Sequence, residues 1–242
     1  MKFIKTAAAF AVTGIAVVIF IPLGCLAFLI SLFGLRKPMG LVLYRIAQLW
    51  ARTVIVFTGC SMTVEGREHI PKSGGVCFVA NHVGIFDIIL ALAYAGRPFG
   101  FIAKKELAYV PGINIWILLL GGLFIDRKQP RKALATINRG IAQIASGGGM
   151  LIFPEGTRSR GRGLAPFLPG ALKLAADSVI VPVAITGSYE VFEKTRLVNA
   201  VPVFVSFLPP LETSGIPPEG RKQILAGRIH DLIAEALERH RG

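Results

Sequence analysis

A histidine and an aspartate five residues apart are the first side chains that could carry out chemistry together. His82 and Asp87 are the residue types needed for a general base whose imidazole is oriented by a carboxylate. About seventy positions later, a turn follows an apolar run, and it consists of Glu155, Gly156, Thr157 and Arg158. Backbone N–H groups and an arginine in such a turn can bind phosphate oxygens. Together the two groups predict an enzyme that acts on a phosphorylated alcohol.

Four sequence blocks follow one another in a fixed order. They are 81–87 (Asn-His-Val-Gly-Ile-Phe-Asp), 121–127 (Gly-Gly-Leu-Phe-Ile-Asp-Arg), 153–159 (Phe-Pro-Glu-Gly-Thr-Arg-Ser) and 181–185 (Val-Pro-Val-Ala-Ile). In type and order they resemble the four blocks of the glycerolipid acyltransferases, and most closely those of the bacterial 1-acyl-glycerol-3-phosphate acyltransferases. The resemblance covers about residues 60–210. One departure is Val83-Gly84, where the family often has a polar pair, which leaves fine substrate preference open.

The resemblance implies a reaction. His82 would remove the proton from the sn-2 hydroxyl of lysophosphatidate as that oxygen attacks an acyl thioester, and Asp87 would fix the imidazole tautomer. The donor would be acyl-CoA or acyl-carrier protein, and the product phosphatidate. Direct transfer is favoured over an acyl-enzyme because the sequence has no Gly-x-Ser-x-Gly elbow. A sister acyltransferase that uses another lysolipid or a lyso-ornithine lipid is the alternative.

Positive side chains are expected to contact the substrate phosphate. Arg158 is the first choice, and the resemblance adds Arg127 and one of Lys104 or Lys105. For the two lysines, a simple solvated role stays open. Glu155 would repel a phosphate, so we expect it to orient a neighbouring cation or the loop. No ligand cluster has metal spacing, and no cofactor is expected beyond the acyl donor as co-substrate.

The net charge of +13 at pH 7 favours anionic partners. Nucleic acid is one such partner, but the chain has no recognition module, zinc pattern or aromatic and basic interleaving. The hydrophobic content of 53% and the mean hydropathy of +0.61 instead predict contact with membrane lipids. A non-catalytic membrane-binding module is a further alternative, although it would not need His82 and Asp87. We therefore expect membrane lipids, lysophosphatidate and the acyl donor as partners, and no nucleic acid.

Residues 1–58 are predicted to form a membrane-associated helical hairpin. Residues 6–35 carry no charge, and this run exceeds the roughly 20 residues that span a bilayer. A cleaved signal peptide fits poorly, because the run is about twice as long as a usual h-region. Lipoprotein processing at Cys25 fits poorly because Pro22 stands where an aliphatic residue is expected. A spanning helix and a hairpin in one leaflet both stay open. In 41–57, Arg45 and Arg52 share one helical face, as in an interfacial helix or a helix packed on the catalytic domain. The expected location is the cytoplasmic face of the cell inner membrane.

Residues 59–242 are predicted to form the acyltransferase domain, with an α/β fold and a mostly parallel sheet flanked by helices. Predicted strands are 75–80, 99–103, 122–125, 150–153, 179–185 and 201–207. Predicted helices are 131–145, 171–177 and 221–239, and 213–220 is a predicted flexible loop. Pro182 interrupts a strand pattern and indicates a sheet edge, a bulge or a strand start.

His82 follows the predicted strand 75–80, and Asp87 falls in the first turn of the next helix. The loop between them is short enough for the carboxylate to fold back towards the imidazole. Cys25, Cys60 and Cys77 have no metal spacing and are predicted to be buried apolar residues in a reducing compartment.

Overall fold

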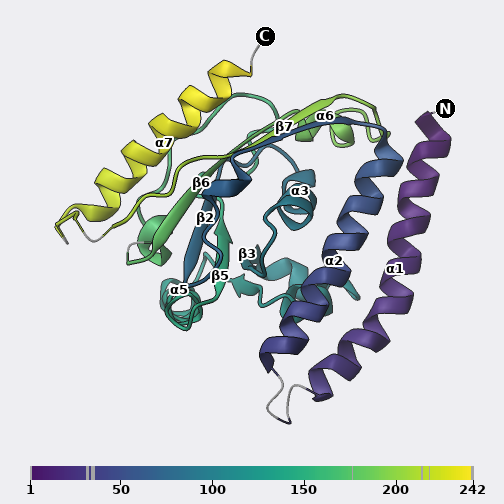
Figure 1. Ribbon diagram of the computed structural model, residues 1–242, viewed down its shortest axis with the longest axis horizontal. Helices are drawn as coiled ribbons and strands as arrows, with labels where there is room; N and C mark the ends of the chain where they lie inside the picture. Colours follow the sequence, from purple (N-terminus) through teal and green to yellow (C-terminus); the bar gives the residue numbers. More distant parts are fainter. Residues whose placement is uncertain are drawn as a thin grey trace.

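The computed structural model describes residues 2–30, 33, 36–175, 177–213, 215–217 and 219–240. A seven-stranded sheet carries helices on both faces, and two long helices precede it (Figure 1). The strands are β1 Ser61–Glu65, β2 Val76–Ala80, β3 Gly100–Lys104, β4 Leu123–Ile125, β5 Gly149–Ile152, β6 Val179–Thr186 and β7 Pro202–Phe207. The helices are α1 Lys2–Ile30, α2 Arg36–Thr58, α3 Phe86–Tyr94, α4 Ile113–Leu119, α5 Pro130–Ala145, α6 Ser188–Val191 and α7 Arg221–Arg239, with the 3-10 turns η2 Arg67–His69, η3 Lys105–Tyr109 and η4 Ala171–Leu174.

The strand order β1-β7-β6-β2-β5-β3-β4 places β2 at the centre of the sheet. All neighbouring strands pair in parallel except β6 and β7, which are antiparallel. The prediction of a mostly parallel α/β sheet is therefore confirmed. Because β2, β3, β4, β5 and β6 run in one direction, their carboxyl ends meet at one edge of the sheet, where ligands of open α/β folds bind.

Strand β2 divides its side chains between two apolar cores. Val76, Phe78 and Ala80 pack with residues of α2, α3 and α4 on one face of the sheet. Cys77 and Val79 pack with residues of α5 and α7 on the other face. All five β2 residues are buried, as expected for an interior parallel strand, so the strand holds His82 on a rigid support.

The first two helices form an antiparallel hairpin beside the sheet domain (Figure 1). Helix α2 buries Ala47, Ala51 and Val54 in the core that α3 shares. Arg52 Nε and Gln48 Nε2 both donate to the carbonyl of Ala93 near the end of α3, at 3.1 and 3.3 Å. For the segment 41–57, the structure therefore agrees with the alternative of a helix packed on the catalytic domain. Residues 31, 32, 34 and 35 of the uncharged run lie outside the described residues.

Most predicted elements match the structure to within one or two residues, but the helix predicted at 171–177 is wrong. Only the 3-10 turn η4 forms there, and it buries Leu172 and Leu174. The backbone N–H groups of Leu172 and Ala175 donate to carbonyls three residues earlier, which is the 3-10 pattern and not the α-helical one. Ala176 lies outside the described residues. Strand β1 and helix α4 had not been predicted. Residues 214 and 218 of the predicted loop also lie outside the described residues.

Pro182 lies in the middle of β6, which is an interior strand, so a sheet edge and a strand start are both wrong. The bulge alternative agrees with the register. Val183 pairs with Phe207 and Ile180 bridges to Leu211, so one extra residue lies on the side opposite Pro182. A proline is tolerated there because the regular antiparallel ladder is already interrupted.

The three cysteines differ in exposure. Cys77 is buried, Cys60 is half-buried and Cys25 is exposed. The prediction of burial is therefore wrong for Cys25, because α1 presents its outer face to the surroundings rather than to the core.

Candidate active site

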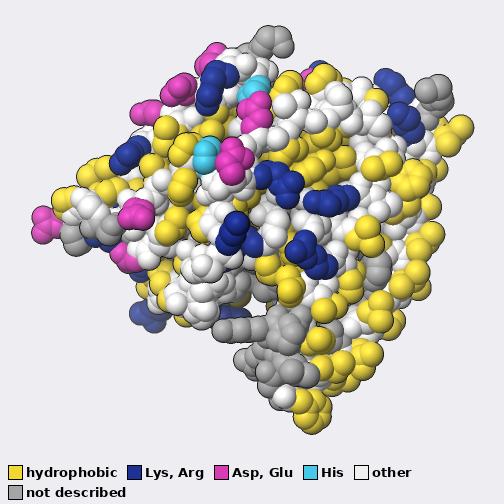
Figure 2. Space-filling view, in the orientation of Figure 1, with side chains coloured by type: hydrophobic (Ala, Val, Ile, Leu, Met, Phe, Trp, Pro, Cys, Tyr) yellow, Lys and Arg dark blue, Asp and Glu magenta, His cyan; other side chains and the backbone are white. Residues whose placement is uncertain are grey.

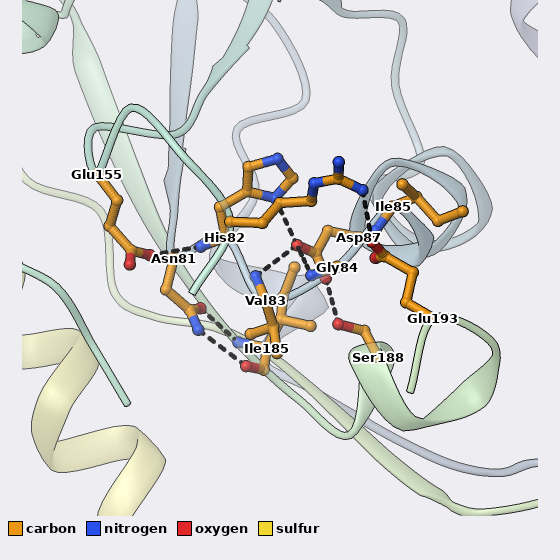
Figure 3. A network of polar contacts seen from close by, with 11 residues as sticks. Asn81, His82, Val83, Gly84, Ile85, Asp87, Glu155, Ile185, Ser188 and Glu193 are labelled. Carbon is orange, nitrogen blue, oxygen red and sulfur yellow. Dashed lines mark hydrogen bonds and ion pairs between the residues drawn. The ribbon is translucent and has the colours of Figure 1, made fainter. Parts of the chain in front are cut away.

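His82 and Asp87 meet at the carboxyl end of the central strand. Strand β2 ends at Ala80, so His82 emerges at the sheet edge, and Asp87 occupies the first turn of α3. His82 Nδ1 lies 2.7 Å from Asp87 Oδ2 (Figure 3). The predicted approach of the carboxylate to the imidazole is confirmed.

The Asp87 carboxylate accepts every hydrogen bond that it makes. Its Oδ2 accepts from the backbone N–H groups of Val83 at 2.8 Å and Gly84 at 3.0 Å. Its Oδ1 accepts from the hydroxyl of Ser188, and the side chain is 0% exposed. Since an ionised carboxylate has no proton to donate, the hydrogen between the two residues belongs to His82 Nδ1. The lone pair of the neutral imidazole is then on Nε2.

The His82 imidazole is held on a second side by an aromatic ring. It stacks on Phe153 with ring centroids 3.9 Å apart and an interplanar angle of 17°. Its side chain is 19% exposed, and within the described part of the chain Nε2 has no hydrogen-bond partner. The ring is therefore fixed in orientation while its basic nitrogen stays free to take a proton from a ligand.

Glu155 ties the turn after β5 to the histidine. Its Oε1 accepts from the backbone N–H of His82 at 2.6 Å (Figure 3). Its Oε2 accepts from the N–H of Ala165 at 3.1 Å. Burial raises the pKa of this carboxyl, while the two backbone donors favour its charged form. Of the two expected roles, orienting the loop agrees with these contacts, because neither partner is a cation.

Backbone bonds join the same turn to the loop after β2. The N–H of Ser159 donates to the carbonyl of His82 at 2.7 Å, and the N–H of Arg160 donates to the carbonyl of Val83 at 3.1 Å. Together with Glu155 they fasten the two loops over the sheet edge. The segment predicted to bind phosphate therefore lies directly beside His82.

Arg158 is connected to the loop after β2 by the acidic residue Glu193. Its Nη1 lies 2.6 Å from Glu193 Oε1, and Glu193 Oε2 accepts from the backbone N–H of Ile85 at 2.5 Å. A Cβ at Gly84 would lie 2.8 Å from Glu193 Oε2 and 3.1 Å from the backbone Cα of Tyr189. This close approach gives a physical reason for glycine at the position where the sequence departs from the family pattern.

Arg127 also reaches the turn after β5. Its Nη1 donates to the carbonyl of Gly156. Gly156 has φ 75°, which favours glycine, and a Cβ there would lie 3.2 Å from the Arg127 guanidinium. Thr157 is exposed beside it. The structure thus brings Arg127 and Arg158 to one turn from different strand ends.

Lys104 and Lys105 differ in the contacts that their side chains make. Lys105 Nζ lies 2.8 Å from Asp126 Oδ2, in the residue before Arg127, and this partner raises the pKa of Lys105. Lys104 is exposed at the end of β3, and no described residue forms an ion pair or hydrogen bond with its side chain. Lys105 therefore belongs to the same basic edge, whereas the solvated alternative agrees with the surroundings of Lys104.

Four residues at this edge had not been assigned to the site from the sequence: Asn81, Phe153, Ser188 and Glu193. Asn81 continues the pairing of β2 with β6 beyond its end, with Nδ2 2.9 Å from the Ile185 carbonyl and Oδ1 2.8 Å from the Ile185 nitrogen. Ser188 follows β6 as His82 follows β2. Polar residues after parallel strands could have indicated Ser188, whereas the chain carries no local sign of Glu193.

No nucleophilic side chain contacts His82 among the described residues. Ser188 donates its hydroxyl to Asp87 rather than to the imidazole. Burial raises the pKa of the Cys77 thiol and so disfavours a thiolate. The arrangement can remove a proton from a bound hydroxyl, and two arginines nearby can bind an anion.

Comparisons with known proteins match this chain to acyltransferases. The protein-family model described as Acyltransferase matches residues 61–186. The 1-acyl-sn-glycerol-3-phosphate acyltransferase of Borreliella burgdorferi is 31% identical over 183 residues, which are 74% of this chain and 73% of the relative. That of Escherichia coli K12 is 31% identical over 218 residues, 86% of this chain and 87% of the relative.

A solved structure shares the fold over the whole chain. The crystal structure of the 1-acyl-sn-glycerophosphate acyltransferase PlsC from Thermotoga maritima superposes with a TM-score of 0.84 and 24% sequence identity. The match covers 100% of this chain and 96% of that chain, and so includes both helices of the hairpin.

Proposed function

Because the chain belongs to the acyltransferase family, as its four blocks predicted, we propose that it acylates the sn-2 hydroxyl of 1-acyl-glycerol-3-phosphate to make phosphatidate. One observation carries this proposal. His82 presents a free Nε2 beside a turn that two arginines reach, so a base and an anion site lie at one sheet edge. The acyl donor is a thioester on coenzyme A or on acyl-carrier protein.

In the proposed mechanism, His82 Nε2 removes the hydroxyl proton while the oxygen attacks the thioester carbonyl. Asp87 stabilises the imidazolium that forms and keeps Nδ1 protonated. Collapse of the tetrahedral intermediate breaks the carbon–sulfur bond, and the imidazolium gives its proton to the leaving thiolate. The enzyme returns to its starting state without an acyl-enzyme.

The substrate phosphate is proposed to bind at the turn formed by Glu155, Gly156, Thr157 and Arg158. Arg158 and Arg127 both have guanidinium N–H groups beyond those bonded to protein atoms, since each guanidinium carries five. Lys105 adds a third positive charge. Lys104 is the weakest member of this set, because its side chain is exposed.

The hairpin is proposed to place the site at a membrane. Figure 2 shows many hydrophobic side chains along the outer edge formed by α1, beyond the positive side chains at its start. On α2, Leu49 and Val56 are 64% and 76% exposed and alternate with the exposed Arg45 and Arg52, as expected at an interface between lipid and water. Exposed apolar residues of α1 and α4 extend this surface: Phe3, Ile4, Phe10, Ile15, Val18, Ile113 and Leu118.

The segment Met39–Thr58 is long and apolar enough to cross a bilayer. However, 39% of its most apolar 18 residues are buried inside the protein, where the helix packs on α3. Burial of one side against an α/β domain supports a hairpin that lies in one leaflet. The cytoplasmic face of the cell inner membrane remains the predicted location.

The proposal is tested by acyl transfer from palmitoyl-CoA in detergent micelles. We expect phosphatidate from 1-acyl-glycerol-3-phosphate with the wild type and none above background with His82→Ala. Acceptors without a phosphate, such as 1-acyl-glycerol and a lyso-ornithine lipid, test the alternative of a sister enzyme. Faster acylation of either of these would reject the proposed acceptor while leaving the mechanism in place.

A further inference from the structure

A cleft lies outside the site described above, between the amino-terminal end of α1 and the segment that follows α6. Its volume is about 460 Å³, within the range of roughly 300–1,000 Å³ that small-molecule sites have. Its polar lining consists of Lys2, Lys5, Glu190, Lys194, Thr195 and Asn199. Figure 2 shows Lys and Arg side chains gathered beside the start of α1, where this cleft lies.

The cleft has more positive than negative charge. Lys194 Nζ lies 2.8 Å from Glu190 Oε1, so the one acidic residue of the lining is already paired. Lys5 Nζ donates to the neutral carbonyl of Thr58 at 3.3 Å, and Lys2 has no described ion-pair partner. Two positive charges therefore remain without a described counter-charge, which favours an anionic ligand.

The wall of the cleft is fixed by internal hydrogen bonds. Asn199 is buried, and its Nδ2 donates to Thr195 Oγ1 at 2.7 Å and to the Glu190 carbonyl at 3.2 Å. The N–H of Val198 donates to Thr6 Oγ1 at 2.8 Å, which attaches the segment to α1. A preformed wall lowers the ordering cost of binding a ligand.

The same segment leads directly to the proposed catalytic residues. Ser188 donates to Asp87, Glu193 contacts Arg158 and the N–H of Ile85, and Lys194 follows Glu193. Lys194 lies six positions after Ser188, so even an extended chain would span at most about 20 Å between them. A ligand that reaches from His82 to the cleft would thus need an arm no longer than about this maximum, with an anionic group at its far end.

We propose that this cleft binds the phosphate groups at the nucleotide end of acyl-CoA while the thioester lies at His82. The inference rests on the proposed acyl transfer. In acyl-CoA the pantetheine arm separates the thioester from the phosphates, which agrees with a base and a basic cleft that lie apart but are joined by one segment of the chain. A concave lining suits a small molecule, whereas a carrier protein would need an interface of about 800 Å² on each partner.

The test compares two donors with the same acyl chain, acyl-CoA and S-acyl-pantetheine, which lacks the phosphates. For the Lys2→Gln/Lys5→Gln double variant, which removes the two charges without a described counter-charge, we expect the KM for acyl-CoA to rise about tenfold. Its kcat and its KM for S-acyl-pantetheine stay at the wild-type values. Lys72→Gln/Lys222→Gln removes the same charge from exposed positions outside the cleft, and should change neither KM.

Three results would overturn the proposal. An equal rise in KM for both donors would mean that the cleft does not contact the phosphates. A rise confined to acyl-carrier protein would assign the lysines to a protein partner. Unchanged KM values together with weaker binding to phosphatidylglycerol vesicles would assign them to lipid headgroups.

Failure of the proposed function is recognised separately. If the wild type makes no phosphatidate with any donor, the proposed reaction is wrong, and calorimetry with coenzyme A alone then tests the cleft. Weaker coenzyme A binding by Lys2→Gln/Lys5→Gln than by the control variant supports the cleft, and equal binding rejects it.

Discussion

The sheet edge and the hairpin differ in the kind of side chain they present and in how those side chains are held. At the sheet edge, Asn81, Asp87 and Glu155 are buried, and each polar side chain has its partners in place. On the hairpin, large apolar side chains such as Phe3 and Val56 face outward. Hydrogen bonds fix atoms to fractions of an ångström, whereas apolar exposure provides adhesion without fixed geometry. The difference indicates that chemistry belongs to the first region and location to the second.

The largest expected effect comes from the imidazole. His82→Ala should lower kcat by about a thousandfold, because a positioned general base contributes 10²–10⁴. The loss should be the same on micelles and on vesicles, since the hairpin is untouched. His230→Ala is the matched control, because His230 lies on α7 and contacts Phe167. Activity near the wild-type level in His82→Ala would assign the proton transfer elsewhere.

The next largest effect is expected from changes in the hairpin, and it is measured as binding to vesicles rather than as activity. Leu49→Gln/Val56→Gln should weaken vesicle binding about thirtyfold in co-sedimentation, since each exposed side chain contributes about 1 kcal/mol on insertion. Activity in micelles should hardly change. Ile224→Gln removes an exposed apolar residue of α7 and should leave vesicle binding intact. Unaltered binding by the double variant would contradict the interfacial role of α2.

Loss of the proposed contact between Arg158 and the substrate phosphate should raise the KM for the acceptor. Arg158→Gln is expected to raise the KM for 1-acyl-glycerol-3-phosphate about tenfold, because a charge-assisted hydrogen bond is worth about 1.5–3 kcal/mol. Arg139→Gln, an exposed change on α5, is the control. If kcat falls and KM stays constant, Arg158 instead positions the loop through Glu193.

Glu155→Gln should have the smallest effect on the reaction and a measurable one on the fold. The amide keeps one acceptor but turns a donor towards a backbone N–H, which costs roughly 1–3 kcal/mol of unfolding free energy. Chemical denaturation measures this change. A stability equal to the wild type would mean that the bonds to His82 and Ala165 contribute nothing net.

The sequence predicted the interior of the sheet better than its margins. Buried strands such as β2 and β6 are continuous apolar runs, and their ends were placed within one residue. Strand β1 was missed because Ser61–Glu65 alternates exposed and half-buried residues at the sheet edge and lacks such a run. The 3-10 turn η4 and the register at Pro182 depend on the spacing between packed elements, which local patterns do not contain.

In the site, local contacts could be predicted and distant ones could not. The His82 and Asp87 pair spans five residues, so one loop brings the two side chains together. Ser188 lies 101 positions from Asp87, and Glu193 lies 108 positions from Ile85 and 35 from Arg158. Only the pairing of β6 with β2 brings these segments together. The functional roles assigned to these residues remain predictions.

The most direct test of this division is the ratio of initial rates on anionic vesicles and on micelles, measured for His82→Ala and for Leu49→Gln/Val56→Gln side by side. The account predicts that His82→Ala loses activity in both media with an unchanged ratio. The hairpin variant should lose activity on vesicles alone, so that its ratio falls. Equal loss in both media by the hairpin variant would contradict the assignment of chemistry to the sheet edge and location to the hairpin.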